Sequence, residues 1–207
     1  MTNSDRFRTL ETLWALWADR GRAMTDEQWQ LPTRLAGWDV RSLYVHAGIW
    51  PVWLTALLGR VSDQQPTHTD VAALLRDFNA PDGIATRMRD QVAASARDTA
   101  AESTTEELVA RFAETGPRAV TLARERGPVV VDYFGQGLLP LDEAAGIGVL
   151  EGTVHLLDLH DALGIAPAVP AEGLAETAAI LTRMASPVAF VEAATGRRAE
   201  NPFPVLT

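Results

Sequence analysis

Apolar residues recur three or four positions apart along most of the chain, and this spacing predicts amphipathic α-helices. In the first segment the apolar positions are Phe7, Leu10, Trp14 and Trp17. The spacing predicts long helices at about 4–24, 40–60, 103 to at least 122, 142–164 and 171–184, with shorter helices at 69–78 and 84–98. This pattern is typical of an all-α fold, in which four long helices form a bundle and smaller helices surround it.

Polar residues and glycine mark the expected helix ends. Asp39 can cap the second long helix, and Asp142 can cap the fourth, which runs to the natural C-cap Gly164. Ser103 and Glu106 fit the S-x-x-E capping box at the start of the third long helix. These signals support the helix boundaries that the apolar spacing predicts.

Proline and glycine predict where the helices break. Pro51 should kink the second helix just after His46, because its ring clashes with the carbonyl four residues earlier. Gly116–Pro117 should interrupt the third long helix. Residues 129–131, all valine, form a strand-like run that we judge too short to imply a sheet, and residues 135–140 are expected to form a loop.

The length and apolar content are sufficient for a full hydrophobic core. With 207 residues and 47% hydrophobic composition, we expect a single domain spanning residues 1–207. Within it, the bundle core should cover about 4–164, and a C-terminal helix and tail should cover 165–207.

The net charge of −9, with acidic and basic residues interspersed, argues against a nucleic-acid partner or an anionic membrane surface. All 18 basic residues are arginine, which suggests a GC-rich coding bias. The first ten residues are mostly polar or charged and lack the apolar core of a signal peptide, and no apolar run approaches the length of about 18 residues needed to span a membrane. We therefore expect a cytoplasmic protein that does not bind membranes.

The chain contains no cysteine. It therefore has no disulfide, no thiolate ligand for a metal and no thiol nucleophile of its own. Any thiol chemistry must use an imported thiol.

Three residues form a candidate metal site. Glu151 and His155 are four residues apart, so on a helix their side chains lie on one face about 6 Å apart. His46 lies on an apolar face of another predicted helix, between Leu43 and Trp50. Two histidines and one glutamate leave coordination positions open, as in a catalytic Zn²⁺ site, and Ni²⁺, Fe²⁺ or Mn²⁺ would also accept these ligands.

Other interpretations of the same residues stay open from the spacing alone. The helix around Glu151 is apolar on most sides, so a carboxylate beside an imidazole there could be a buried ion pair. The helix could also pack loosely enough to expose that side. A single histidine on an apolar face, as at His46, is usually a core residue with a hydrogen-bonding partner.

Asp158 has two possible roles. It is three residues beyond His155 and could hold the other ring nitrogen of a metal-binding histidine. We favour the alternative that Asp158 belongs with His160 and Asp161 to a solvated helix end. His68 lies in a polar loop and receives no role.

Aromatic and basic residues are candidates for substrate or cofactor binding. Trp50, Trp53 and Tyr133 could line a substrate pocket beside the metal, together with Phe134, although helical spacing also suits packing. Arg197 and the adjacent Arg198 could bind a carboxylate or phosphate if the tail folds back, and are otherwise solvated.

Three segments resemble a known family. They are EQWQLPTRLAGWDVRSLYVHAGIW (27–50), GVLEGTVHLLDLHDALG (148–164) and EAATGR (192–197). The segments are similar, in this order, to DinB-like proteins of the mycothiol-dependent maleylpyruvate isomerase N-terminal group. The pairing of W-x-V-x-x-L-x-x-H with E-x-x-x-H-x-x-D-L carries most of the resemblance.

The resemblance implies a DinB-like four-helix bundle with His46, Glu151 and His155 as ligands, normally of Zn²⁺. Members use a low-molecular-weight thiol, mycothiol in actinobacteria, in isomerase or S-transferase reactions. This use agrees with a chain that lacks cysteine, because a metal ion lowers the pKa of an imported thiol. The expected partners are the thiol and a small-molecule substrate, and the protein should be a monomer or homodimer.

Two departures from the family shape the expected function. The chain continues only a few residues beyond Gly196, so we expect no separate C-terminal domain, and Gly148 stands where many relatives have arginine. We therefore expect a metal-dependent S-transferase or isomerase that acts on a small electrophile other than maleylpyruvate. The alternatives are a thiol-independent lyase, cyclase or hydrolase, and a stress protein that binds a small ligand without catalysis.

Overall fold

The computed structural model of the chain describes residues 5–197. Of these residues, 68% are helical and they include one small sheet, so the prediction of an all-α fold is confirmed. The helices are α1 (Arg6–Ala23), α2 (Asp26–Trp29), α3 (Val40–Ala47), α4 (Ile49–Leu57), α5 (Val71–Phe78), α6 (Ile84–Glu102), α7 (Thr105–Ala110), the π-helical segment η1 (Arg111–Thr115), α8 (Gly116–Arg126), α9 (Leu141–Ala162), α10 (Ala171–Met184) and α11 (Pro187–Ala194). The strands are β1 (Val61–Ser62), β2 (Val130–Asp132) and β3 (Leu138–Pro140).

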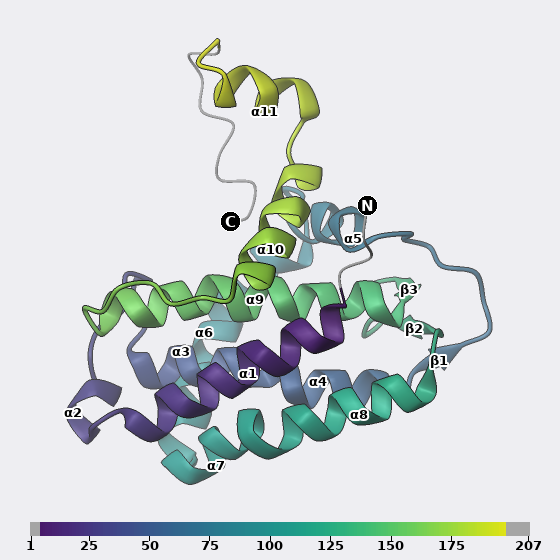
Figure 1. Cartoon of the computed structure of the whole chain (residues 1–207). Coiled ribbons are helices and arrows are strands. Elements are labelled where there is room, and N and C mark those ends of the chain that lie inside the picture. Colours follow the sequence, from purple (N-terminus) through teal and green to yellow (C-terminus); the bar gives the residue numbers. More distant parts are fainter. Residues whose placement is uncertain (1–4, 198–207) are drawn as a thin grey trace.

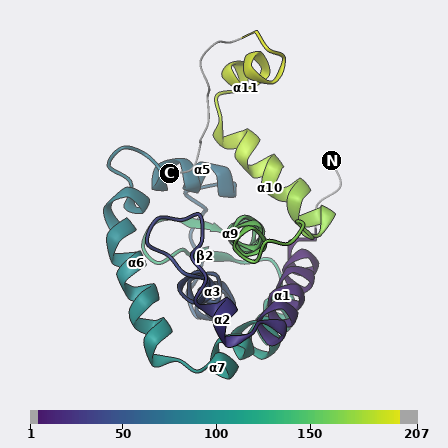
Figure 2. The same ribbon diagram turned by 90° about the vertical axis from the view of Figure 1, so that its left-hand side faces the viewer.

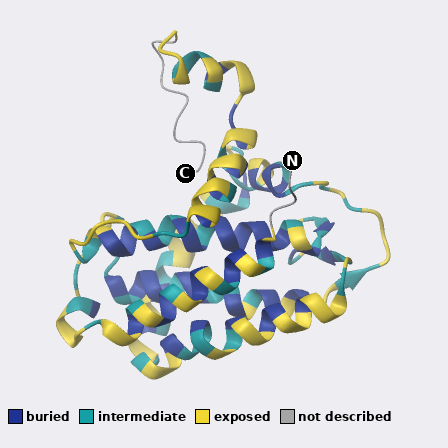
Figure 3. Cartoon of the chain, in the orientation of Figure 1, coloured by how far each residue is buried: buried dark blue, intermediate teal, exposed yellow. Residues whose placement is uncertain are grey.

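Four helical rods lie side by side in the body of the molecule (Figure 1): α1, α3 with α4, α7 with η1 and α8, and α9. Helix α9 packs against both α1 and α3, and α6 lies on the outer side of α3 (Figure 2). Figure 3 shows that buried residues line the facing sides of these rods.

An aromatic cluster fills the centre of the bundle. Trp17 stacks on Phe112 with ring centroids 5.2 Å apart, and Tyr44 packs edge-on against both rings. The indole nitrogen of Trp17 donates a hydrogen bond to the carbonyl of Gly152 at 3.0 Å. Because Gly152 follows Glu151 directly, this contact fixes α9 against α1 next to the candidate metal site.

The second predicted helix is broken where proline was expected to break it. The structure divides it into α3 and α4 at Gly48, whose backbone nitrogen still donates to the carbonyl of Tyr44 at 2.9 Å. Pro51 has no N–H for the carbonyl of Ala47, so the helical ladder fails there. The break keeps His46 in the last turn of α3.

Helix α9 is buried along most of its length, in keeping with its apolar sequence. It ends at Ala162, close to the predicted end, with Leu163 as the C-cap followed by Gly164, whose φ is 64°. The prediction that Asp142 caps its start is wrong: the N-cap is Pro140, and no side chain caps the helix. Asp142 lies in the first turn instead, where its carboxylate still faces the positive end of the helix dipole.

The third long helix differs from its prediction in two details. Its capping box is formed by Thr104 and Glu107, one residue later than the predicted pair. Both pairs fit the sequence motif. The expected interruption at Gly116–Pro117 is a change of helix type and not a break in the chain's helical course: the π-helical segment η1 ends at Thr115 and α8 begins at Gly116. Pro117 occupies the first turn of α8, where a missing N–H is tolerated.

The prediction that no sheet forms is wrong. Strand β2 pairs antiparallel with β1 on one side and with β3 on the other, so the expected loop at 135–140 ends in a strand. Val131 and its partner Leu139 are fully buried. Pairing across three very short segments, rather than an alternating pattern in any one of them, stabilises this sheet.

Helix α10 crosses α9 and also packs against α5. The buried guanidinium of Arg6 connects these elements, because it binds Glu143 of α9 and Glu176 of α10, each at 2.7 Å. Helix α11 stands on α10, away from the four rods (Figure 1). No single helix in residues 5–197 is long and apolar enough to cross a membrane; only α10 and α11 together, across a 119° bend, meet that test by length and composition.

Candidate metal centre

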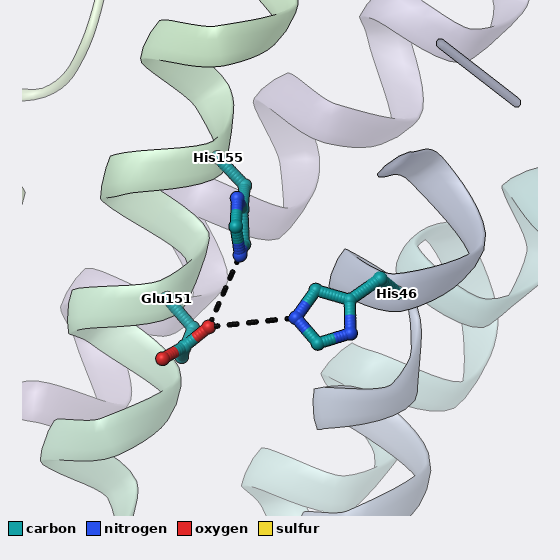
Figure 4. A group of neighbouring side chains, drawn as sticks. All are labelled: His46, Glu151 and His155. Atoms are coloured by element: carbon teal, nitrogen blue, oxygen red, sulfur yellow. Dashed lines mark ion pairs between the residues drawn. The ribbon is translucent and has the colours of Figure 1, made fainter. Parts of the chain in front are cut away.

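The side chains of His46, Glu151 and His155 meet between α3 and α9 (Figure 4). The Glu151 Oε2 atom lies 3.2 Å from the Nε2 atom of His155 and 3.7 Å from the Nε2 atom of His46. One ligand atom from each residue lies within 4.8 Å of the other two. The fold therefore brings His46 to Glu151 and His155, which lie more than a hundred positions further along the sequence.

The donor set and its geometry suit a divalent cation. In a tetrahedral site with metal–ligand bonds of 2.0–2.1 Å, neighbouring ligand atoms lie about 3.3 Å apart. The two distances from Glu151 bracket this value, so a cation could bind all three residues with small side-chain movements. Two imidazoles and a carboxylate are typical ligands of zinc and of other first-row divalent metals.

The three side chains are partly accessible to solvent. Their exposed fractions are 22% for His46, 22% for Glu151 and 14% for His155. The site is therefore neither a sealed ion pair nor part of the exposed surface, and a small molecule could reach it from one side.

Without a bound cation, the triad is a charged network. Burial opposes ionisation of Glu151, but hydrogen bonds with His155 and His46 outweigh it and lower the pKa of the carboxyl well below its usual range. Burial likewise opposes the charge on His155, yet its hydrogen bonds to Asp158 and Glu151 raise its pKa to about 9. At neutral pH, Glu151 is therefore negative and His155 is positive.

Asp158 lies directly behind His155. The Nδ1 atom of His155 donates a hydrogen bond to Asp158 Oδ2 at 2.8 Å, which directs Nε2 toward Glu151. Our preferred interpretation of a solvated helix end is wrong, because the Asp158 side chain is only 3% exposed and His160 is fully buried. Asp158 thus has the position of a carboxylate that orients a metal-binding histidine.

The loop at residues 31–39 supplies two contacts that the sequence did not indicate. Arg34 Nε donates to Asp158 Oδ1 at 2.6 Å, and the ring of Trp38 packs edge-on against His46 with centroids 5.4 Å apart. A single arginine in a proline-containing loop carries no motif for this role. Only the folded chain reveals the contact, which spans 124 sequence positions.

The predicted pocket residues form one aromatic group beside the triad. Trp50 packs on Trp53, which packs on Phe134, and Phe134 packs on Tyr133, with ring centroids 5.0–5.3 Å apart. Phe134 has a φ of 53°, an unfavourable value for a bulky residue, in the turn between β2 and β3. The strained turn holds two of the aromatic rings in place.

Trp50, Trp53 and Tyr133 line a small cavity together with Gly148, which lies about one helical turn before Glu151. Its volume is about 10 Å³, enough for roughly one water molecule. A substrate must therefore bind mainly on the open side of the triad. Burial, together with the charge of Glu151, raises the pKa of the Tyr133 hydroxyl well above its usual range, so the hydroxyl keeps its proton.

The remaining candidates lie apart from the triad. Arg197 follows α11; its backbone nitrogen donates a hydrogen bond to the carbonyl of Glu192, and its guanidinium donates one to the carbonyl of Thr195. Arg198 lies outside the described residues. His68 pairs with Asp77 at 3.0 Å, so it has the partner that the sequence did not indicate.

Most of the chain matches a known protein family. The family model described as mycothiol maleylpyruvate isomerase N-terminal domain matches residues 10–160, and this family belongs to the DinB-like superfamily. The matched range includes all three residues of the triad. Searches among curated proteins and among solved structures gave no significant match.

Proposed function

Because the chain belongs to the mycothiol maleylpyruvate isomerase N-terminal domain family, we propose that it is a metal-dependent enzyme that uses a low-molecular-weight thiol. Its reaction would be an S-transfer to, or an isomerisation of, a small electrophile, with mycothiol as the thiol and zinc as the metal. The observation that carries this proposal is the triad, whose ligand atoms from two helices lie within 4.8 Å of one another on a partly exposed face.

His46, Glu151 and His155 would hold the cation. When bound, it would supply a Lewis acid that lowers the pKa of the thiol and favours the thiolate. The chain itself offers no cysteine that could replace the imported thiol. The partial exposure of the triad leaves room for the thiol and the electrophile on the same side.

The surrounding residues would orient and restrict the reactants. The hydrogen bond from His155 to Asp158 keeps Nε2 of His155 directed at the site. Both carboxylate oxygens of Asp158 already have partners, so Asp158 is not free to accept a proton from a substrate. Tyr133 is buried and keeps its proton at neutral pH, so it would not act as a base.

A thiol-consumption assay tests this proposal. The zinc-loaded protein is incubated with mycothiol and 1-chloro-2,4-dinitrobenzene, and then with a panel of small α,β-unsaturated carbonyl compounds. We expect thiol adducts or isomerised products with the wild type, and a loss of at least about 100-fold in His155→Ala. The matched control is His68→Asn, which removes a histidine–carboxylate pair outside the triad and should keep full activity.

The other outcomes of this assay separate the competing functions. Turnover of an electrophile without any thiol would indicate a lyase, cyclase or hydrolase. Tight capture of a ligand without product would indicate a binding protein. Full thiol-dependent activity in a metal-free preparation would overturn the role of the triad.

A further inference from the structure

The loop at residues 31–39 is a closed and well-fixed element. The backbone nitrogen of Thr33 donates to the carbonyl of Trp38, and that of Val40 donates to the carbonyl of Leu31, each at 2.9 Å. Pro32 and Asp39 form an isolated β-bridge across its base. Asp39 also caps α3, the helix that carries His46. The loop therefore has a defined position relative to the triad.

This loop contacts both histidines of the triad, each in a different way. Trp38 packs against the ring of His46. Arg34 reaches His155 through Asp158, in a chain of two short hydrogen bonds of 2.6 Å and 2.8 Å. Each oxygen of Asp158 accepts one of these bonds, so the carboxylate is held from both sides.

We propose that Arg34 is a positioning residue for the metal site, which holds Asp158 in the orientation that directs His155 toward the cation. This inference rests on the proposed function, because it concerns the affinity of the triad for a metal.

Charge and burial explain why Arg34 is needed. The Asp158 side chain is 3% exposed, and a buried carboxylate is costly without a positive partner. Arg34 is 51% exposed, so it neutralises Asp158 while its own charge stays in contact with water. Without it, Asp158 would keep, among residues 5–197, only its hydrogen bond with His155 and could turn away from the geometry that the triad requires.

The arrangement also contributes to the net charge near the cation. Glu151 and Asp158 carry two negative charges, and Arg34 compensates one of them. With a divalent cation bound, the group retains a charge of about +1, which favours an anionic ligand such as a thiolate over a neutral one. Arg34 thus supports both the position of His155 and the preference for a negative ligand.

A double-mutant cycle tests this role. The affinity for zinc is measured by competition with a chromogenic chelator for the wild type, Arg34→Gln, Asp158→Asn and the double variant. Removing a partner of a metal ligand typically weakens metal binding by roughly 10- to 100-fold. We expect a loss of about 10-fold in Arg34→Gln and a larger loss in Asp158→Asn. Because Arg34 acts through Asp158, the double variant should bind zinc no more weakly than Asp158→Asn.

Two further variants separate positioning from a general effect on charge or folding. Arg34→Lys keeps the positive charge and should recover most of the affinity. Arg124→Gln removes a similarly exposed arginine of α8 that pairs with Glu11 of α1 at 2.7 Å, and it should leave the affinity unchanged. Circular dichroism and thermal unfolding verify that each variant is folded.

A direct structural readout complements the affinities. The proton on His155 Nδ1 should be protected from solvent exchange in the NMR spectrum of the wild type and exchange faster in Arg34→Gln. The proposed role of Arg34 would be refuted, and the metal site kept, if the wild type binds zinc and Arg34→Gln binds it equally well. It would also be refuted if the losses of zinc affinity in Arg34→Gln and Asp158→Asn add in the double variant. If the wild type itself binds no zinc, the proposed function fails.

Discussion

Zinc binding should depend strongly on pH, because the cation and a proton compete for His155. The pKa of His155 is raised to about 9 by its hydrogen bonds to Asp158 and Glu151, which outweigh the opposing effect of burial. A metal can bind Nε2 only after that nitrogen has lost its proton. Each pH unit below 9 should therefore lower the apparent affinity about tenfold, and at pH 7 it should be about 100-fold below its limiting value.

Competition with a chelator at controlled free zinc concentration, between pH 6.5 and 9.5, measures this slope. Calorimetry in two buffers of different ionisation enthalpy counts the protons released, and we expect about one from His155 at pH 7. His68→Asn should keep the same dependence of zinc affinity on pH. Asp158→Asn should lower the pH at which the affinity reaches its limiting value, because it removes a hydrogen bond that raises the pKa of His155. An affinity that is constant between pH 7 and 9, without proton release, would refute the proposed network.

Three further predictions concern stability and are measured by thermal or denaturant unfolding. In the metal-free protein, the raised pKa of His155 should add up to about 3 kcal/mol to the free energy of unfolding, at about 1.4 kcal/mol per pKa unit. This contribution is complete below pH 6.5 and lost as the pH rises through 9, so unchanged stability over that range would contradict it. Arg6→Met leaves two partly buried carboxylates without their cation and should cost about 3 kcal/mol; a neutral effect would show that α10 docks without this network. Gly21→Ala places a methyl group against the buried Tyr44 hydroxyl and should cost about 1–3 kcal/mol, and a stabilised variant would contradict that packing.

The helices were largely predictable because their signals are local. The apolar spacing of Trp14 and Trp17 and the terminal Gly164 each act within a few turns of one helix. The break after His46 follows from the missing N–H of Pro51 in the same way. Where two local signals overlapped, as in the capping boxes that begin at Ser103 and Thr104, the sequence could not distinguish between them.

The features that were missed depend on contacts between distant segments. Strand β1 has two residues and becomes a strand only when β2 lies beside it. Asp158 was expected at a solvated helix end, but the loop at residues 31–39 covers it and Arg34 pairs with it. The triad could be proposed because the spacing of Glu151 and His155 is local, whereas the proximity of His46 is a property of the folded bundle.

The central claim is that His46, Glu151 and His155 bind a divalent cation. Crystals soaked in zinc, with diffraction data collected at the zinc absorption edge, test it most directly. We predict one strong anomalous peak about 2.0–2.2 Å from the Nε2 atoms of both histidines and from a carboxylate oxygen of Glu151. The absence of a peak at the triad, with zinc bound elsewhere or not at all, would contradict the claim.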